Sequence, residues 1–500
     1  MAFPPLSVLI SGPMKPLRIL IVSSEIAPFA KTGGLADVTA ALGRYLARTG
    51  HDVRLLMPLY ERIPANTKGS ISFSPRLTGL RMGLGSRTFP YSVGSAALPK
   101  SETSVHFLAS NELYGRKGIY TQDPDEPVRF AFLSRAALEF CQHLGWAPDV
   151  IHANDWHTGL LPLYLKTHFA WDRLFQRTRT LLTIHNIGYQ GTFGSGVLEE
   201  VSLANERKLV HQDHLRDGHV SFLETGILYA DALTTVSETY AREIQTSEFG
   251  MGLEGPLRAR ADALHGILNG IDDGEWNPET DPYLERSYSA DDLAGKEANK
   301  RALLDDFELP YDADVPVFGI VSRLTAQKGF ELLPDVLAVL LREADLRLVV
   351  LGSGEERHEQ YFQWLHDTFP SQVGVYRGHD ERIAHRIEAG SDLFLMPSRY
   401  EPCGLNQMYS LRYGTVPIVR RTGGLADTVE PYDPETGRGT GFLFDEFRSE
   451  ALLEAVREAL ACWSDRFTWQ RLMRNGMSRD FSWDRQGERY VELYRELLAV

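Results

Sequence analysis

The octapeptide Lys31-Thr-Gly-Gly-Leu-Ala-Asp-Val38 follows a short aliphatic run, Arg18–Val22, and precedes a stretch of helical periodicity that begins near Ala36. Paired glycines let the backbone approach an anion, and the amides at a helix start are unpaired donors. Lys31 could neutralise a phosphate oxygen there, although a plain Gly-Gly turn with a solvent-facing lysine explains this stretch equally well. Either way, the order of strand, glycine turn and helix predicts a Rossmann-like unit.

Aliphatic and β-branched runs alternate with helical stretches along the rest of the chain, as in parallel sheets covered by helices. The expected strands of the first half are Arg18–Val22, Val53–Met57, Val150–His152, Thr180–His185 and Ala232–Val236. Those of the second half are Val315–Val321, Arg347–Leu351, Val373–Tyr376, Leu393–Pro397 and Val416–Val419. The hexapeptide at 32–37 also recurs letter for letter at 422–427. The sequence therefore predicts an α/β fold with two Rossmann-like domains.

The segment Gly266–Asp281 is dense in Gly, Asn, Asp and Pro, which predicts a crossing between domains. We place the N-terminal domain at residues 1–265, and we expect residues 1–13 to be disordered. The second domain should begin at residue 266.

The bulk composition excludes several classes of protein. The 500 residues suffice for two cored domains, and the formal charge of −15 argues against nucleic acid or anionic membrane as a partner. Cys141, Cys403 and Cys462 show no metal-ligand spacing, so we expect no disulfide framework and no metal site. No run reaches the ~18 apolar residues of a membrane span, and we predict a cytoplasmic protein.

A second candidate for phosphate binding is Ser322–Gly329, at the carboxyl end of the first strand of the second domain. Ligands of doubly wound sheets bind at such ends. Arg323 and Lys328 could both reach one diphosphate across the turn. Two basic residues at a solvated helix start would be the better interpretation if this stretch stood alone.

A third candidate is Pro397–Gln407, where Glu401 precedes a glycine turn that opens a helix. The turn offers amides to phosphate, and the carboxylate can accept hydrogen bonds from sugar hydroxyls. A helix-capping carboxylate is an equally good interpretation. Cys403 is expected to be a packed side chain rather than a nucleophile.

Polar residues also follow two strands of the first domain, in Ile151–His157 and Thr183–Gly191. A single histidine is usually structural. Two strand ends that together carry a carboxylate, an amide and two imidazoles predict a polar cleft facing the second domain. These residues are Asp155, His157, His185 and Asn186.

Taken in order from about Arg18 to Leu497, six motifs resemble the glycogen and starch synthases of glycosyltransferase family five. They are KTGGLADV, HANDWHTGL, TIHNIGYQG, GILNGID, SRLTAQKG and YEPCGLNQMYSLRYGT. The resemblance implies the GT-B fold, in which two Rossmann-like domains face each other across a deep cleft. It also implies that the second domain ends near residue 480 and that a final segment, 481–500, returns to the first domain as a helix over Trp483–Leu497.

The resemblance further implies roles for individual residues. Arg323 and Lys328 would hold the diphosphate, Glu401 would bind glucose hydroxyls, and His185 would offer its backbone carbonyl to the anomeric centre. The remaining residues expected to bind substrate are Lys31, Gly33, Gly34, Asp37, Asp155, Asn186, Asn269, Asp272, Gly352, Gly354, His379, Cys403, Gly404, Leu405 and Asn406.

The implied reaction is transfer of glucose from ADP-glucose to the 4-hydroxyl at the non-reducing end of an α-1,4-glucan such as glycogen, with retention. Neither a metal nor a cofactor is expected, because two fixed cations and helix N-termini can stabilise the leaving diphosphate. UDP-glucose as donor and a catalytically weak glucan-binding paralogue stay open as alternatives. A dehydrogenase is disfavoured because no G-x-G-x-x-G motif precedes a suitably spaced acid, and a phosphorylase because no pyridoxal-binding lysine motif is found.

Three positions depart from the family pattern, and a fourth departs from that of related retaining transferases. Glu224 stands where the family often has lysine, which reverses a charge, and Asn154 replaces a frequent histidine. His379 stands where we expect an aromatic ring stacked on the adenine. Tyr409 replaces the second glutamate of related retaining transferases, as is usual in this family.

Overall fold

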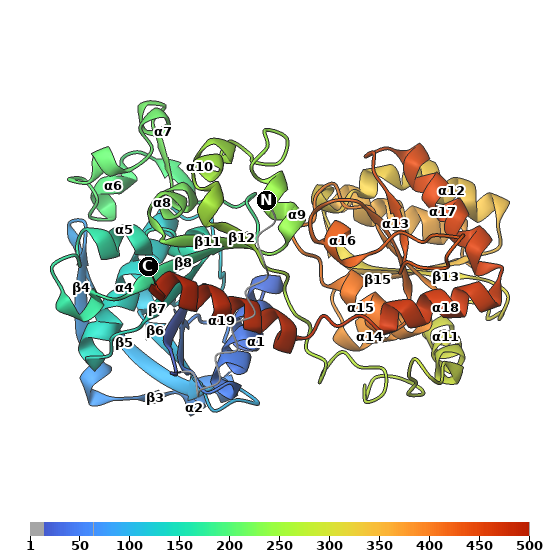
Figure 1. Ribbon diagram of the computed structural model, residues 1–500, viewed down its shortest axis with the longest axis horizontal. Coiled ribbons are helices and arrows are strands. Elements are labelled where there is room, and N and C mark those ends of the chain that lie inside the picture. The colour runs from blue at the N-terminus through green and yellow to red at the C-terminus, as the bar shows by residue number, and fades with distance from the viewer. Residues whose placement is uncertain (1–14, 64, 500) are drawn as a thin grey trace, which may run out of the picture.

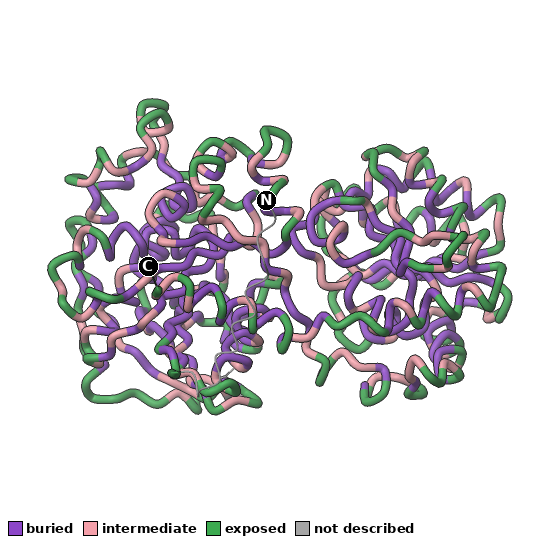
Figure 2. The backbone as a smooth tube through the Cα atoms, in the orientation of Figure 1, coloured by how far each residue is buried: buried purple, intermediate pink, exposed green. Residues whose placement is uncertain are grey.

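The computed structural model describes residues 15–63 and 65–499, and it consists of two α/β domains side by side (Figure 1). Residues 1–13, which we expect to be disordered, lie outside the described part of the chain. Each domain is built on its own sheet, and buried residues concentrate along the two sheets (Figure 2).

The N-terminal sheet has ten strands in the order β12-β11-β8-β7-β1-β2-β6-β5-β3, with β4 paired to β5. The strands are β1 (Arg18–Val22), β2 (Asp52–Pro58), β3 (Ser72–Phe73), β4 (Leu80–Leu84), β5 (Arg87–Ala97), β6 (Ser104–Ala109), β7 (Val150–Asn154), β8 (Arg179–Ile184), β11 (Ala232–Thr235) and β12 (Leu264–Gly266). A separate hairpin pairs β9 (Thr192–Gly194) with β10 (His219–Ser221). The helices are α1 (Gly34–Arg48), α2 (Ala65–Ser70), α3 (Asn111–Tyr114), α4 (Glu126–Leu144), α5 (Leu161–Lys166), α6 (Val197–Glu200), α7 (Gln212–Arg216), α8 (Phe222–Tyr229), α9 (Glu238–Glu243) and α10 (Glu254–Ala259).

The C-terminal sheet is entirely parallel, in the order β15-β14-β13-β16-β17-β18. Its strands are β13 (Val317–Leu324), β14 (Arg347–Gly354), β15 (Val373–Arg377), β16 (Leu393–Met396), β17 (Val416–Arg420) and β18 (Phe442–Phe444). The helices are α11 (Ala294–Asp306), α12 (Pro334–Glu343), α13 (Glu356–Thr368), α14 (Glu381–Gly390), α15 (Asn406–Arg412), α16 (Gly423–Thr428), α17 (Ser449–Trp463) and α18 (Arg466–Met477). The strand order reverses direction beside β13, which puts the ends of β13 and β16 at a position typical of ligand binding.

The chain crosses between the domains twice, and the two crossings lie side by side. Ile271 in the first crossing forms a parallel bridge with Ser482 in the second. A Cβ on Gly270 would lie only 2.8 Å from the Trp483 ring, so the close approach requires glycine there.

The last helix, α19 (Trp483–Ala499), lies across the N-terminal domain (Figure 1). It packs on α1, where Arg48 forms an ion pair with Asp484. The Tyr494 hydroxyl is 2.8 Å from Nδ1 of the buried His152. The final helix thus packs on the first domain. Among the described residues, no helix is both long and apolar enough to cross a bilayer.

Candidate active site

A cleft of about 950 Å³ lies between the domains, at the carboxyl ends of strands from both sheets. Fourteen of the predicted residues line it: Gly33, Gly34, Asp155, His157, His185, Asn186, Asn269, Arg323, Lys328, Glu401, Cys403, Gly404, Leu405 and Asn406. The structure therefore brings together residues that are up to 373 positions apart in the sequence, from Gly33 to Asn406.

The first glycine loop opens α1 toward the cleft. Gly33 is the N-cap of this helix, and no side chain caps the helix start. A Cβ at Gly33 would meet nothing within 4 Å, so the space above this backbone is open. The unpaired amides of a 15-residue helix therefore face the cleft, which is the arrangement that binds anions.

Buried Glu25 fixes the position of this loop. Its carboxylate accepts hydrogen bonds from the Thr32 backbone amide and, at 2.6 Å, from the Thr32 hydroxyl. The Tyr120 hydroxyl donates to the same carboxylate. Glu25 and Tyr120 also line the cleft, and the sequence analysis did not identify either residue.

Lys31 and Asp37 lie beside the cleft rather than in its lining. Their side chains form an ion pair of 2.8 Å and are about half and one third exposed. Desolvation raises the pKa of Asp37 in spite of the neighbouring ammonium of Lys31. Lys31 is thus held at the mouth of the glycine loop, within a partly solvated pair.

On the N-terminal side of the cleft, hydrogen bonds orient His185. Its backbone amide donates to Oδ1 of Asp155 (2.7 Å), and its Nε2 donates to Oδ1 of Asn154 (2.9 Å). Burial lowers the pKa of His185 to about 3 and raises that of Asp155 to about 7. The imidazole is therefore neutral at physiological pH, and Asn154 supplies an acceptor for its ring N–H.

On the C-terminal side, Nζ of Lys328 lies 2.6 Å from Oε2 of Glu401. The Ser398 hydroxyl donates to the same oxygen at 3.0 Å. The side chains of Lys328 and Glu401 are 18% and 6% exposed, so this pair is largely withdrawn from water. Arg323 is exposed along the same wall.

The second copy of the glycine hexapeptide supports the loop that carries Glu401. The Gly424 amide donates to the Glu401 carbonyl at 3.0 Å. A Cβ at Gly423 would lie 1.9 Å from that carbonyl oxygen, and a Cβ at Gly424 would lie 2.1 Å from the Cys403 carbonyl oxygen. These glycines therefore allow close packing beneath the loop, whereas those of the first copy face the cleft.

The turn after Glu401 is shaped by backbone geometry and burial. Gly404 has a φ of +72°, a conformation that favours glycine, and Nδ2 of Asn406 donates to the Val321 carbonyl at 2.5 Å. Burial raises the pKa of the Cys403 thiol to about 12. Cys403 is thus protonated and packed, in agreement with the expectation that it is not a nucleophile.

Besides Lys31 and Asp37, four predicted residues lie away from the cleft lining. Asp272 is 3.7 Å from Arg44 at the domain crossing. Gly352 and Gly354 allow β14 to lie close to β13, since their Cβ atoms would lie 2.2 and 2.4 Å from carbonyl oxygens of β13. His379 is exposed just after β15. Substrate contacts by these four residues stay predictions, as do those by the residues that line the cleft.

Two Rossmann-like domains that face one cleft, with a glycine loop on one side and paired cationic and acidic groups on the other, define a GT-B glycosyltransferase. The fold agrees with that of sucrose-phosphate synthase from Thermosynechococcus elongatus, which is 19% identical, with a TM-score of 0.62 over 96% of this chain and 99% of that one. The predicted fold class is therefore confirmed.

The more specific assignment comes from closer relatives. The starch synthase catalytic domain family matches residues 18–259, and glycosyl transferases group 1 matches residues 304–475. Glycogen synthases of Syntrophotalea carbinolica and Myxococcus xanthus are 46% and 47% identical, each over 97% of this chain and over 99% and 100% of their own. The catalytic domain of starch synthase IV from Arabidopsis thaliana, solved with ADP and acarbose, is 33% identical, with a TM-score of 0.89 over 97% of this chain and all of that one. The chain belongs to the glycogen and starch synthase family, and it is a glycosyltransferase.

Proposed function

We propose that this protein transfers glucose from ADP-glucose to the non-reducing-end 4-hydroxyl of an α-1,4-glucan, with retention of the α configuration, in the cytoplasm. The observation that carries the proposal is that one cleft holds Arg323, Lys328, Glu401 and the uncapped start of α1. A sugar diphosphate needs positive charge at the phosphates and a polar acceptor at the sugar. The groups that line the cleft supply both.

Charge stabilisation of the leaving group is the largest contribution in this scheme. Negative charge grows on the diphosphate as the bond to the anomeric carbon breaks. Arg323 and Lys328 stabilise that charge from the C-terminal domain, and the amides at Gly33 and Gly34 do so from the N-terminal domain. The leaving oxygen takes the proton of the acceptor hydroxyl as the new bond forms on the same face.

Glu401 binds protein side chains before the donor arrives and glucose hydroxyls afterwards. In the structure described here it accepts from Lys328 and Ser398. When a diphosphate attracts Lys328, the second carboxylate oxygen and the released lone pairs are available to glucose hydroxyls. The ion pair thus keeps both groups in the cleft until the donor binds.

His185 contributes through its backbone rather than its ring. Asn154 accepts from its neutral ring, and Asp155 accepts from the backbone amides of both His185 and Asn186. The second of these amides belongs to the peptide that carries the His185 carbonyl, so this carbonyl is held in position. A carbonyl oxygen near the anomeric carbon would stabilise the oxocarbenium-like transition state electrostatically. We propose no metal ion and no cofactor in the transfer, because these fixed groups supply the required charge.

Donor selection is assigned to the end of β15. His379 lies just after this strand. Tyr376, which is 39% exposed, lies within the strand, three residues before His379. Either ring could stack on the base of the nucleotide.

The experiment measures initial rates of labelled glucose transfer onto glycogen from ADP-glucose and, separately, from UDP-glucose, with and without EDTA. We expect a strong preference for ADP-glucose and no loss of rate with EDTA. Transfer from UDP-glucose alone would contradict the donor assignment. Glycogen binding without transfer from either donor would instead support a glucan-binding paralogue.

A further inference from the structure

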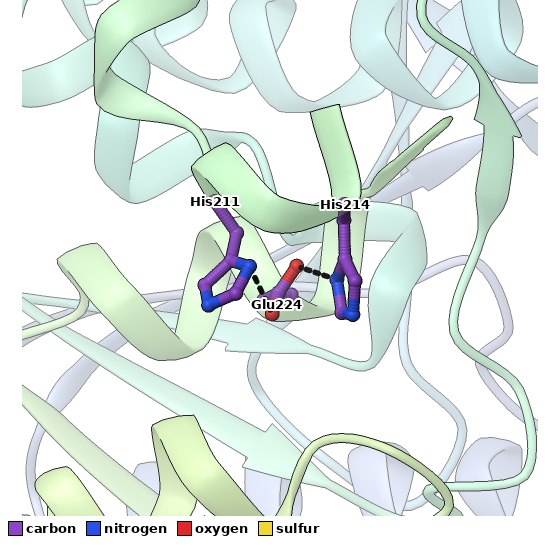
Figure 3. A group of neighbouring side chains, drawn as sticks. All are labelled: His211, His214 and Glu224. Atoms are coloured by element: carbon purple, nitrogen blue, oxygen red, sulfur yellow. Dashed lines mark hydrogen bonds and ion pairs between the residues drawn. The ribbon is translucent and has the colours of Figure 1, made fainter. Parts of the chain in front are cut away.

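A cluster of His211, His214 and Glu224 lies in the N-terminal domain, outside the residues that line the cleft (Figure 3). His211 immediately precedes α7, His214 lies in α7, and Glu224 lies in the first turn of α8. One donor atom from each residue lies within 4.8 Å of the other two. Figure 3 shows both imidazole rings directed toward the carboxylate.

The cluster contains a buried carboxylate oxygen and an imidazole nitrogen that lack hydrogen-bond partners. Oε2 of Glu224 is 2.7 Å from Nδ1 of His214. Oε1 of Glu224 and Nδ1 of His211 are 3.6 Å apart, too far for a hydrogen bond, and within the described part of the chain neither atom has another partner. The Glu224 side chain is only 3% exposed, so a buried acceptor is left unsatisfied.

We propose that His211, His214 and Glu224 bind one zinc-type divalent cation. Two imidazole nitrogens and one carboxylate are a ligand set that suits zinc, whereas magnesium prefers oxygen ligands. Donors at about 2.1 Å from a tetrahedral ion are separated by about 3.4 Å. The separations of 2.7 and 3.6 Å bracket this value, so small side-chain rotations admit the ion in place of the His214 proton.

The site would stabilise a segment that borders the cleft. Ser221, the residue before α8, accepts from the Glu224 amide at 3.1 Å and donates to the Gln190 carbonyl at 3.0 Å. The Phe222 amide donates to the Gly191 carbonyl at 3.0 Å. Gln190 and Gly191 both line the cleft. A metal that joins α7 to α8 therefore fixes the helix turn on which this part of the cleft rests.

This proposal does not depend on the proposed donor or acceptor, since it concerns metal binding alone. The test uses the tag-free full-length protein, stripped with a chelator and dialysed. Zinc and magnesium are titrated separately by calorimetry, and retained metal is measured by mass spectrometry. We expect one zinc per chain and no magnesium binding under the same conditions.

Substitutions then locate the ion. Glu224→Gln and His214→Asn should each weaken zinc binding more than about tenfold, because each removes a ligand. Glu224→Lys, which introduces the residue frequent in the family, should abolish binding. The matched control is His168→Asn, since His168 lies 3.6 Å from the single carboxylate of Glu206 and should leave zinc binding unchanged.

Circular dichroism and thermal melting check that each variant is folded, and hydrogen exchange reports on residues 207–221. Slower exchange of this segment with zinc in the wild type, but not in Glu224→Gln, would support the site. Zinc binding that survives Glu224→Gln and is lost in Glu381→Gln would overturn it, because the ion would then lie at Glu275, Glu381 and His385. Absence of zinc binding by the wild type would overturn it as well.

Discussion

Lys328 and Glu401 illustrate how single residues serve two states of this enzyme. Their 2.6 Å ion pair satisfies two largely buried side chains that would be costly to leave unpaired. Water at the cleft screens the ion pair and weakens it. A donor diphosphate, which carries two negative charges, can therefore compete with Glu401 for Lys328. A cationic site that is neutralised before the donor binds also avoids holding unrelated anions.

Asp155 makes the free energy of unfolding of the protein depend on pH. Burial raises its pKa from 3.8 to about 7, so the folded state binds a proton more tightly than the unfolded state does. The contribution of this bound proton to the free energy of unfolding is fully present below about pH 3.8 and is lost as pH rises through about 7. Asp155→Asn mimics the protonated form and should remove this dependence.

The measurement is the difference in melting temperature between wild type and Asp155→Asn from pH 4 to 8. We expect the wild type to lose stability relative to the variant as pH rises toward 7. A difference that stays constant over this range would show that Asp155 is ionised throughout. Asp172→Asn, at a partly exposed cap that accepts from the Leu174 amide, is the control.

The sequence predicted fourteen of the residues that line the cleft, at glycine turns, strand ends and the domain crossing, because backbone chemistry marks these positions locally. It did not predict Glu25 and Tyr120, which are 95 residues apart and meet only in the folded chain. Nor did it indicate that the two cleft groups Lys328 and Glu401 pair with each other. Side-chain pairing across a cleft depends on tertiary placement, which no local pattern encodes.

At the scale of elements, identical hexapeptides have different structural roles. In the first copy, a Cβ at Gly34 would make an ordinary 3.8 Å contact with Leu405. At the equivalent Gly424, a Cβ would lie 2.1 Å from a carbonyl oxygen. The surroundings of each turn, rather than its letters, decide what the glycine does.

We therefore expect alanine at Gly34 to affect mainly the transfer rate and alanine at Gly424 to affect mainly the stability of the fold. Gly34→Ala should change the free energy of unfolding by less than about 1 kcal/mol, since alanine favours a helix, but should lower the rate of glucose transfer by narrowing the approach to the amides. Gly424→Ala should destabilise the fold by about 1 to 3 kcal/mol through overpacking. Denaturant unfolding and initial rates measure both effects, and equal destabilisation by the two variants would contradict the distinction.

All ten strands expected from the sequence form, with boundaries shifted by up to three residues. Those strands lie in parallel sheet flanked by helices, so their apolar runs are continuous. The strands between residues 72 and 109, the hairpin β9–β10 and the three-residue strands β12 and β18 were not predicted. Residues 87–97 of β5 alternate between buried and exposed positions and pair antiparallel with β3, β4 and β6, which is a weaker signal than a continuous apolar run.

At the scale of the whole molecule, a second set of contacts joins the domains on the far side of the Glu401 loop. The Glu243 carboxylate in α9 accepts from the Gly423 amide and the Thr422 hydroxyl, both at 3.0 Å. Asp427 in α16 accepts from the backbone and hydroxyl of Thr239. These bonds hold the C-terminal domain against the N-terminal one at the position of the second hexapeptide.

Glu243→Gln should weaken this contact by about 1 to 2 kcal/mol, because a charged acceptor of two hydrogen bonds is replaced by a neutral one. In calorimetry we expect the unfolding transition to broaden or divide as the domains uncouple. Glu238→Gln on the same helix is the control, since its exposed carboxylate pairs with Arg489 outside the domain contact. Identical calorimetric profiles for both variants would argue that the contact contributes nothing to domain coupling.

In the proposed reaction, the cleft between the domains stabilises a departing diphosphate through Lys328. The most direct measurement is kcat for transfer from ADP-glucose to glycogen by Lys328→Ala, beside Lys166→Ala, whose lysine pairs with Asp231 away from the cleft. We predict a loss of about a hundredfold in Lys328→Ala, equivalent to about 3 kcal/mol, and no loss of rate in the control. The variant should stay folded at the assay temperature, although its melting temperature falls because Glu401 keeps only Ser398 as a donor. A folded Lys328→Ala enzyme with wild-type kcat would contradict the account.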